Sequence, residues 1–286
     1  MLTKLFYGLL LLLSSSVYVD SLQCYRCTEE YKSPFNLTVT AENFPSFGPT
    51  CNLTEAKHQC FSKIFVFLNN NVTTQTIISY GFDPMSDTDP TIISPGHYVR
   101  LGVSRQLIEV TWLKSIQYNC IEDGCNSADN MKRVLKSTTH LTHDFEKLDS
   151  LIAPIPNFNS SSCVDMSYMP TIPCEPSVPA NKCGQCKLMF YTVHNETCAR
   201  CVEFSSGYAN SVTRHTIFRL SDRSQSDQFD MQCSVQNCNS PSNADRIIET
   251  STLIFDVNEF LGSKAVSSSF SSYIYLFILI SFLNKI

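Results

Sequence analysis

Four cysteines near the middle of the chain have the spacing of a metal-binding ribbon. They form two Cys-x-x-Cys pairs, Cys183 with Cys186 and Cys198 with Cys201, separated by eleven residues. Four thiolates at this spacing can hold Zn²⁺ in a tetrahedral site, and one such pair can act as a redox centre. In an oxidising compartment the same cysteines form disulfides instead. The choice therefore depends on where the chain folds.

The N-terminus has the layout of a secretory signal peptide. Lys4 precedes the apolar run LFYGLLLLL, which the small polar segment SSSVYVDS closes, so we expect residues 1–21 to be removed after Ser21. The remaining chain then folds where disulfides form, and both halves contain an even number of cysteines. The first half contains Cys24, Cys27, Cys51, Cys60, Cys120 and Cys125, and the second Cys163, Cys174, Cys183, Cys186, Cys198, Cys201, Cys233 and Cys238. We expect three disulfides and four disulfides respectively, no bound metal and no cofactor.

Other residue types that carry chemistry form no recognisable site. The six histidines are scattered, and His140 with His143 could share a helix face but have no clear third metal ligand. No HExxH, GxSxG, Walker or dinucleotide motif is present. A net charge of −5 without a Lys/Arg cluster argues against nucleic acid as a partner. We therefore expect a protein that is not an enzyme.

The chain contains an internal duplication. Residues 120–150 match residues 233–263 at an offset of 113, with ten identities in 31 positions, where about two are expected by chance. The identities include the two cysteines and the Asn of the CxxxxCN segment that opens each copy. Two related modules in tandem are the simplest explanation.

The hydrophobic pattern is that of β structure. Between residues 108 and 120 apolar side chains alternate with polar ones, and Lys114 is the exception on the apolar side, which indicates a bulge or a break. The segments KIFVFL and TQTIISYGF, and KLMFYTV and CARCVEF, read as two hairpins. After Asn126 the apolar spacing approaches 3.6 residues, which predicts a short helix, whereas the run TSTLIF weakens the same prediction in the second copy.

These features resemble the Ly-6/uPAR superfamily, the family of three-finger or LU domains. The resemblance rests on the start LQCYRC, on hairpins between the cysteines and on the closing CxxxxCN segment, and it is best over residues 22–126. It implies the pairs Cys24–Cys60, Cys27–Cys51 and Cys120–Cys125, and a structural role for Asn126 and Asn239. The second module departs from the family at its start. With Cys233–Cys238 assigned, fifteen connectivities remain for its other six cysteines.

The expected organisation is an all-β, disulfide-rich chain of two tandem small modules. Residues 22–130 would form the first three-finger domain, 131–160 a helical or extended linker, 161–243 a divergent second domain and 244–263 a stalk. The short apolar tail Tyr273–Leu283 follows small residues and a serine-rich spacer, so residues 264–286 resemble a signal for a glycosylphosphatidylinositol (GPI) anchor. We expect attachment at Ser263, with Gly262 and the serines at 267–269 as alternatives. Five glycosylation sequons fit an extracellular surface: Asn36, Asn52, Asn71, Asn159 and Asn195.

The expected function is that of a GPI-anchored protein on the outer face of the plasma membrane. By resemblance its partner would be a receptor, an ion channel or an adhesion molecule. Residues 79–98 lack periodicity and read as a surface loop, in which Phe82, Asp83, Asp87, Asp89 and Tyr98 are the candidate partner-binding residues. A soluble secreted inhibitor or toxin-like ligand, and a secreted hydrolase, are the alternatives.

Overall fold

The computed structural model of the chain describes most residues between Ser21 and Gly262. The described residues are 21–27, 31–32, 38–69, 72–82, 96–106, 111–152, 158, 162–170, 174–193, 195–203 and 210–262. Several residues singled out from the sequence lie outside these ranges, namely Asn36, Asn71, Asp83, Asp87, Asp89, Asn159, His194 and Ser263. Residues 1–20 of the expected signal peptide and residues 264–286, the expected anchor signal, lie outside them as well.

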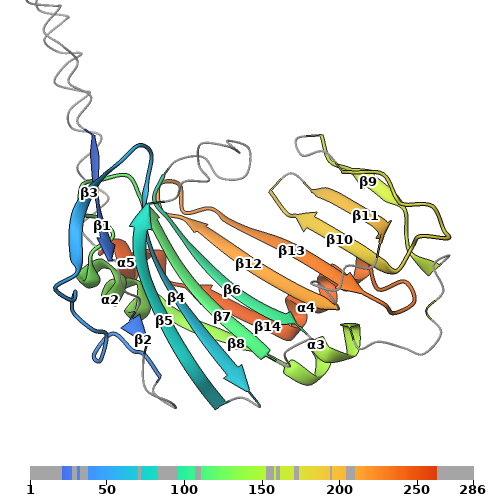
Figure 1. Cartoon of the computed structure of the whole chain (residues 1–286), viewed down its shortest axis with the longest axis horizontal. Helices are drawn as coiled ribbons and strands as arrows, with labels where there is room; N and C mark the ends of the chain where they lie inside the picture. Colours follow the sequence, from blue (N-terminus) through green and yellow to red (C-terminus); the bar gives the residue numbers. More distant parts are fainter. Residues whose placement is uncertain are drawn as a thin grey trace, which may run out of the picture.

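The fold is mostly β, as the sequence predicted, and its main element is a ten-stranded antiparallel sheet (Figure 1). In sheet order the strands are β2 (Tyr31–Lys32), β5 (Val72–Phe82), β4 (Cys60–Asn69), β7 (Thr111–Cys120), β6 (Tyr98–Gln106), β12 (Ser211–Arg219), β13 (Gln225–Cys233), β10 (Gln185–Tyr191), β11 (Glu196–Val202) and β9 (Met166–Tyr168). The strands β1 (Leu22–Cys27) and β3 (Cys51–Ala56) pair in a separate small sheet. The two hairpins expected from the sequence are confirmed as β4–β5 and β10–β11.

Each copy of the repeat contributes four strands in the same relative order. The first copy has the order β5-β4-β7-β6, and the second has β11-β10-β13-β12. The copies meet where β6 pairs with β12, antiparallel, from Tyr98 opposite Arg219 to Gln106 opposite Ser211. Because the repeat offset is 113, this register is symmetric about Gly102 and His215, so the two copies are related by an approximate two-fold axis.

A second layer covers one face of the large sheet (Figure 1). The first copy supplies α2 (Ala128–Ser137), β8 (Thr138–His143) and α3 (Phe145–Ile152), and the second supplies α4 (Ser242–Thr250), β14 (Ser251–Phe255) and α5 (Val257–Leu261). Strand β8 pairs antiparallel with β14, helix α2 contacts α5, and α3 contacts α4. The second layer therefore follows the same approximate two-fold relation as the sheet.

The two segments expected as a linker and a stalk are folded in this layer, at least up to Ile152 and Leu261. Leu148 and Ile152 of α3 are buried in the core of the second copy, and Phe255 and Phe260 are buried in the core of the first. Each copy thus completes the other's core with the last part of its helix–strand–helix segment. This exchange could not be predicted from the sequence. The apolar residues of 131–152 and 244–261 are buried partly against the other copy, which is distant in the chain.

The short helix predicted after each CxxxxCN segment is present. In the first copy the side chain of Ser127 caps α2 by accepting a hydrogen bond from the Asn130 backbone N–H, and Met131 and Val134 face the core. The helix ends at Ser137 and the chain continues as strand β8, because the β-branched pair Thr138–Thr139 favours extended backbone. The run TSTLIF in the second copy likewise contributes strand β14.

The bulge or break expected at Lys114 is absent. Strand β7 continues through Lys114, which pairs with Val66 of β4 and Val103 of β6. The register shift nearest to it lies instead between Phe67 and Leu68 in the β4–β5 hairpin. The Lys114 side chain is half-buried on the covered side of the sheet and requires another explanation.

Candidate binding face

Three disulfides hold the first copy. They join Cys24 to Cys60, Cys27 to Cys51 and Cys120 to Cys125, which are the pairs that the family resemblance implied. The first bridge ties β1 to the start of β4, and the third closes the turn after β7. Bridges of this kind restrict the unfolded chain and contribute about 2–4 kcal/mol each.

Four disulfides hold the second copy and leave no free cysteine among the described residues. They join Cys163 to Cys186, Cys174 to Cys198, Cys183 to Cys201 and Cys233 to Cys238. Both CxxC pairs are therefore divided among three bridges, and the sulfurs of Cys163, Cys183 and Cys201 lie within 4.8 Å of one another because two bridges pack together. The bridge Cys163–Cys186 occupies the position of Cys24–Cys60, since Cys186 pairs with Cys233 as Cys60 pairs with Cys120.

Asn126 connects three strands in the first copy. Its side-chain amide nitrogen donates to the carbonyl oxygens of Tyr25, Phe61 and Gly81, at 2.8, 2.9 and 3.3 Å, and its oxygen accepts from the Tyr25 backbone N–H at 2.9 Å. The residue is fully buried. It therefore ties the closing loop to β1, β4 and β5, as expected from the sequence.

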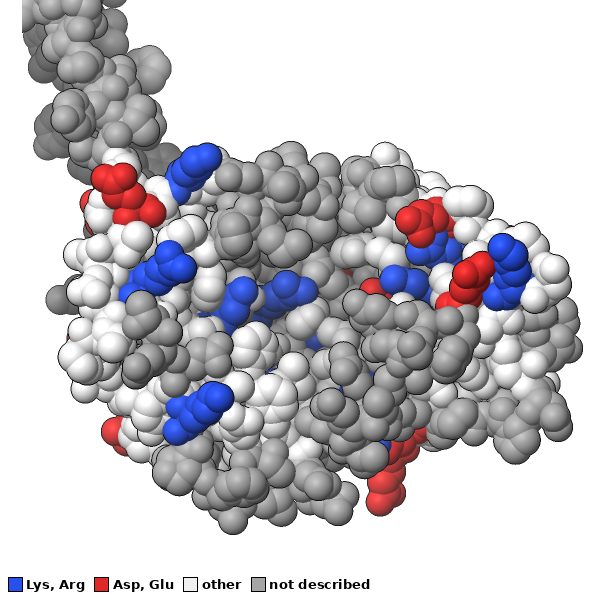
Figure 2. Space-filling view, in the orientation of Figure 1, with Lys and Arg blue, Asp and Glu red and all other residues white. Residues whose placement is uncertain are grey.

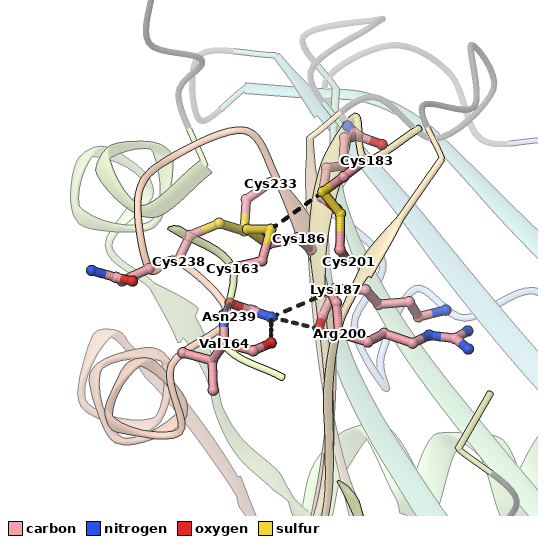
Figure 3. The surroundings of a disulfide bond; sticks show 12 residues. Cys163, Val164, Cys183, Cys186, Lys187, Arg200, Cys201, Cys233, Cys238 and Asn239 are labelled. Atoms are coloured by element: carbon pink, nitrogen blue, oxygen red, sulfur yellow. Dashed lines mark hydrogen bonds between the residues drawn. A yellow bond between two sulfur atoms is a disulfide. The ribbon is translucent and has the colours of Figure 1, made fainter. Parts of the chain in front are cut away.

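Asn239 makes the same set of bonds in the second copy (Figure 3). Its amide nitrogen donates to the carbonyl oxygens of Val164, Lys187 and Arg200, and its oxygen accepts from the Val164 N–H at 2.9 Å. Val164 follows Cys163 as Tyr25 follows Cys24, and Lys187 follows Cys186 as Phe61 follows Cys60. The divergent start of the second copy thus has the same local architecture as the first.

The face of the sheet opposite the helical layer carries no further helix or strand within the described residues. Figure 2 shows a recess in the middle of this side of the molecule, with Lys and Arg side chains gathered in it. A pocket of about 620 Å³ lies here, over β6, β12, β13 and β10. Its lining is mainly polar: Arg100, Lys187, Tyr191, Ser211, Thr213, His215, Gln228, Phe229, Asp230 and Gln232. The volume is within the range of ligand-binding pockets, whereas the lining is more polar than is usual for them.

Charge is distributed unevenly within this pocket. The ammonium of Lys187 lies 3.5 Å from the carboxylate of Asp230, and burial raises the pKa of Asp230 although Lys187 opposes that effect. Burial and the nearby Arg100 guanidinium lower the pKa of His215 to about 3, so this imidazole is neutral at physiological pH. Next to the pocket, Arg200 pairs with Glu175 at 2.8 Å. A group that enters this pocket therefore meets fixed charges of both signs.

The first copy gives the same face an apolar half. Residues that pair across neighbouring strands lie on the same face, and Phe65 is in the row that contains Ser115, Gly102 and His215. Phe61 and Phe67 share this face with Phe65, and all three are half-buried. Lys63 lies beside them, with its ammonium 4.2 Å from the ring centroid of Phe61. An apolar patch beside a polar pocket is a composition suited to binding another protein.

The loop residues proposed from the sequence fall elsewhere. Phe82 is the last residue of β5, is half-buried against the first core and has the Arg26 guanidinium 5.5 Å from its ring centroid. Tyr98 is the first residue of β6 and is only 3% exposed, so it cannot form part of an accessible surface. Of the sequons, Asn52 and Asn195 are described, and both are exposed.

The pocket residues were not predicted from the sequence, because partner binding was expected in loops. Arg100, Thr213, His215 and Asp230 instead lie within strands, at the polar positions of an alternating pattern. Those positions are ordinarily expected to face solvent. Only the pairing of β6 with β12, which joins segments more than 100 residues apart, shows that they converge.

The histidines and the single tryptophan have structural environments. His140 and His143 lie three apart on strand β8 and so point to opposite faces, not to one helix face. His143 stacks on Trp112 with ring centroids 5.1 Å apart, and Trp112 is 4% exposed. His97 lies 3.7 Å from the carboxylate of Glu122 and 3.5 Å from the Tyr118 hydroxyl.

Comparison of the chain with protein-family models, curated proteins and solved structures finds no match. Of the helices that the structure describes, none has the length and apolar character needed to cross a bilayer.

Proposed function

We propose that this chain is a GPI-anchored cell-surface protein with two tandem three-finger modules of the Ly-6/uPAR type, and that it binds another extracellular protein through the face of its shared sheet. The function is recognition and not catalysis. The binding face consists of the polar pocket over β6, β12, β13 and β10 together with the apolar patch formed by Phe61, Phe65 and Phe67.

The family assignment is supported by a local architecture that occurs twice. In each copy a bridge joins an N-terminal segment to the start of the first long strand, and a second bridge closes the loop after the fourth strand. In each copy a buried Asn also bonds to the residue after the first cysteine and to both strands of the first hairpin. For the first module, the sequence resemblance implied these bridges and this role of the Asn. Their repetition supports a three-finger assignment for the second module as well as for the first.

The observation that carries the binding function is the asymmetry between the two faces of the sheet. One face is closed by helices and by β8 and β14, whereas the other has a recess lined by charged and polar side chains next to half-buried aromatic rings. A surface on which aromatic rings lie beside charged and polar groups is typical of a site where another protein binds and covers those rings. A rigid sheet stapled by disulfides keeps these side chains in place before the partner arrives, which lowers the entropic cost of binding.

The proposed anchor would hold the folded unit close to the lipid. Helix α5 ends at Leu261, two residues before Ser263, so no long stalk would separate the modules from the membrane. Treatment of intact cells with a phosphatidylinositol-specific phospholipase should release the protein. Retention on the cell surface after this treatment, or spontaneous release without it, would contradict the anchor.

A matched pair of variants tests the binding face. Thr213 lines the pocket, whereas Thr252 is exposed on β14, in the layer on the other side of the sheet. Secreted protein would be tested against a panel of purified receptor, channel and adhesion ectodomains. We expect Thr213→Trp to abolish binding to a partner found in this panel and Thr252→Trp to leave it unchanged. Equal binding by both variants would remove the recessed face from the account.

A further inference from the structure

A second cavity lies on the covered side of the sheet, between the sheet and the second layer. Its volume is about 560 Å³. Its apolar wall consists of Val39, Val66, Leu68, Ile116, Leu135 and Leu141. Residues 38–42 close one side of it, and α2 with the start of β8 closes another. The cavity is thus built from the loop after residue 37, the sheet and the helical layer together.

The cavity lies where the two cores of the molecule meet. Ile116, Leu135 and Leu141 belong to the core of the first copy or pack on it, and Leu68 belongs to the core of the second. Val66 packs against both. The cavity is open to solvent, since Thr38, Thr40 and Glu42 of its lining are exposed, but its wall on the sheet and the second layer is largely apolar. A gap of this size with an apolar wall is therefore suited to an apolar ligand.

Three charged side chains line the cavity: Lys114 enters its apolar wall from the middle of β7, Lys136 lies on α2, and Glu42 is exposed on the loop at residues 38–42. No carboxylate of the described residues forms an ion pair with the Lys114 ammonium, and burial lowers its pKa. Lys136 also lines the cavity, but its ammonium lies 2.7 Å from the Glu259 carboxylate and is already paired. A half-buried ammonium without a counter-charge is costly and is stabilised by an anion that reaches it.

In the second copy, the charge at the equivalent strand position is neutralised by another residue of the protein. Asp227 corresponds to Lys114 at the repeat offset and is also charged and largely buried. It forms an ion pair at 3.0 Å with Arg214, which corresponds to Leu101. The first copy therefore has a charged side chain at this position, Lys114, but has the apolar Leu101 where the second copy has the pairing Arg214.

We propose that the cavity binds a single-chain anionic lipid, with the acyl chain along the apolar wall and the acidic headgroup on the Lys114 ammonium. A carboxylate and a phosphate share the required chemistry, so a fatty acid and a lysophospholipid are the two sources to distinguish. This site is separate from the recessed binding face, which lies on the other side of the sheet. The proposal does not depend on the proposed function.

The experiment uses secreted protein of residues 22–262, which contains every helix and strand described. Binding of the fluorescent fatty acid cis-parinaric acid is titrated, and palmitate, lysophosphatidate and hexadecanol are tested as competitors. Hexadecanol has the same acyl length as palmitate without the charge. Lys114→Met retains most of the side-chain volume, and Lys63→Met is the matched control, because Lys63 lies on the opposite face of the sheet. Ala41→Trp fills the cavity from the loop side.

We expect saturable binding at one site per chain and displacement by palmitate, by lysophosphatidate or by both. Loss of the charge-assisted bond should make hexadecanol roughly tenfold weaker than the charged competitor, and Lys114→Met should remove that difference while Lys63→Met preserves it. Ala41→Trp should abolish binding. Absence of saturable binding to the folded protein, unchanged binding by Ala41→Trp, or an undiminished preference for the anion in Lys114→Met would overturn the proposal.

Discussion

Gly102 of β6 and His215 of β12 lie directly opposite each other at the centre of the strand pair that joins the two copies. They are also equivalent positions of the repeat, since their numbers differ by 113. The approximate two-fold axis of the molecule therefore passes between a glycine and an imidazole. A Cβ atom at position 102 would overlap Nδ1 of His215 and Oγ of Ser115. One copy has a glycine at this position and the other has a histidine. Only one side chain therefore occupies a space that is too small for two.

Replacement of this glycine should weaken the joint between the copies. Gly102→Ala introduces the methyl group that the imidazole excludes, and we expect a loss of about 1–3 kcal/mol in the free energy of unfolding. Chemical denaturation monitored by circular dichroism measures it. Gly48→Ala is the control, because the nearest atom to a Cβ there is 3.9 Å away. His215→Ala should relieve part of the cost in the double variant, and additive effects would show that the two residues do not clash.

The two buried asparagines should contribute similarly to stability. Asn126→Ala and Asn239→Ala each remove four hydrogen bonds and leave buried backbone groups without a partner, so we expect each to cost at least about 2–3 kcal/mol or to reduce secretion sharply. Asn258→Ala, at an exposed position of α5, should have little effect. Thermal unfolding of the secreted proteins measures both. A stable Asn239→Ala variant beside an unfolded Asn126→Ala variant would contradict the structural equivalence of the copies.

The ion pair between Arg214 and Asp227 should be important for the packing of the second layer. Arg214 also donates hydrogen bonds to the carbonyl oxygens of Ile248 and Ser251, where α4 ends and β14 begins. Arg214→Met leaves the Asp227 carboxylate largely buried and unpaired, so we expect a loss of about 3–5 kcal/mol. Glu259→Gln, which breaks the exposed pair with Lys136, should cost much less, because solvent screens an exposed ion pair. Equal losses of unfolding free energy in these two variants would show that the buried ion pair contributes no more to stability than the exposed one.

Stability should fall as the pH is lowered from 6.5. Burial lowers the pKa of His215 to about 3 and that of His143 to about 4, so both are neutral in the folded state where the unfolded chain is already protonated. The unfolded state then binds more protons, and the free energy of unfolding decreases by about 1.4 kcal/mol per pH unit for each histidine. Asp230, with its raised pKa, opposes this trend in part. Chemical denaturation between pH 7 and 4.5 should show this loss of stability. His215→Gln should make the loss less steep. The same dependence of stability on pH in the variant and the original protein would contradict the low pKa of His215.

Much of the local structure could be predicted from the sequence, because it depends on neighbouring residues. The hairpins follow from alternation and turn residues, the helix after Asn126 follows from apolar spacing near 3.6 residues, and the structural role of Asn126 follows from the family resemblance. The joining of β6 to β12 could not be predicted, since the two strands are far apart in the chain and each reads simply as a strand with one polar side.

The burial of the last segment of each copy and the position of the binding pocket could not be predicted from the sequence either. From the sequence, Leu148 and Phe260 belong to a linker and a stalk, yet each is buried in the core of the other copy. Tyr98 was expected at a partner surface and is buried, whereas Thr213 and His215 lie in the pocket. These positions depend on which surfaces meet in three dimensions, and the repeat offset alone does not specify that.

The central claim is that the recessed face of the shared sheet is the protein-binding surface. The most direct test places a photo-reactive amino acid at Thr213, in the pocket, or at Ile254, which is 44% exposed on the other side of the molecule. The full chain carrying one or the other is displayed on cells that normally express it, irradiated and analysed by mass spectrometry. The account predicts a defined covalent adduct with one extracellular protein from position 213 and none from position 254. Adducts from position 254 alone, or the same adduct from both positions, would contradict it.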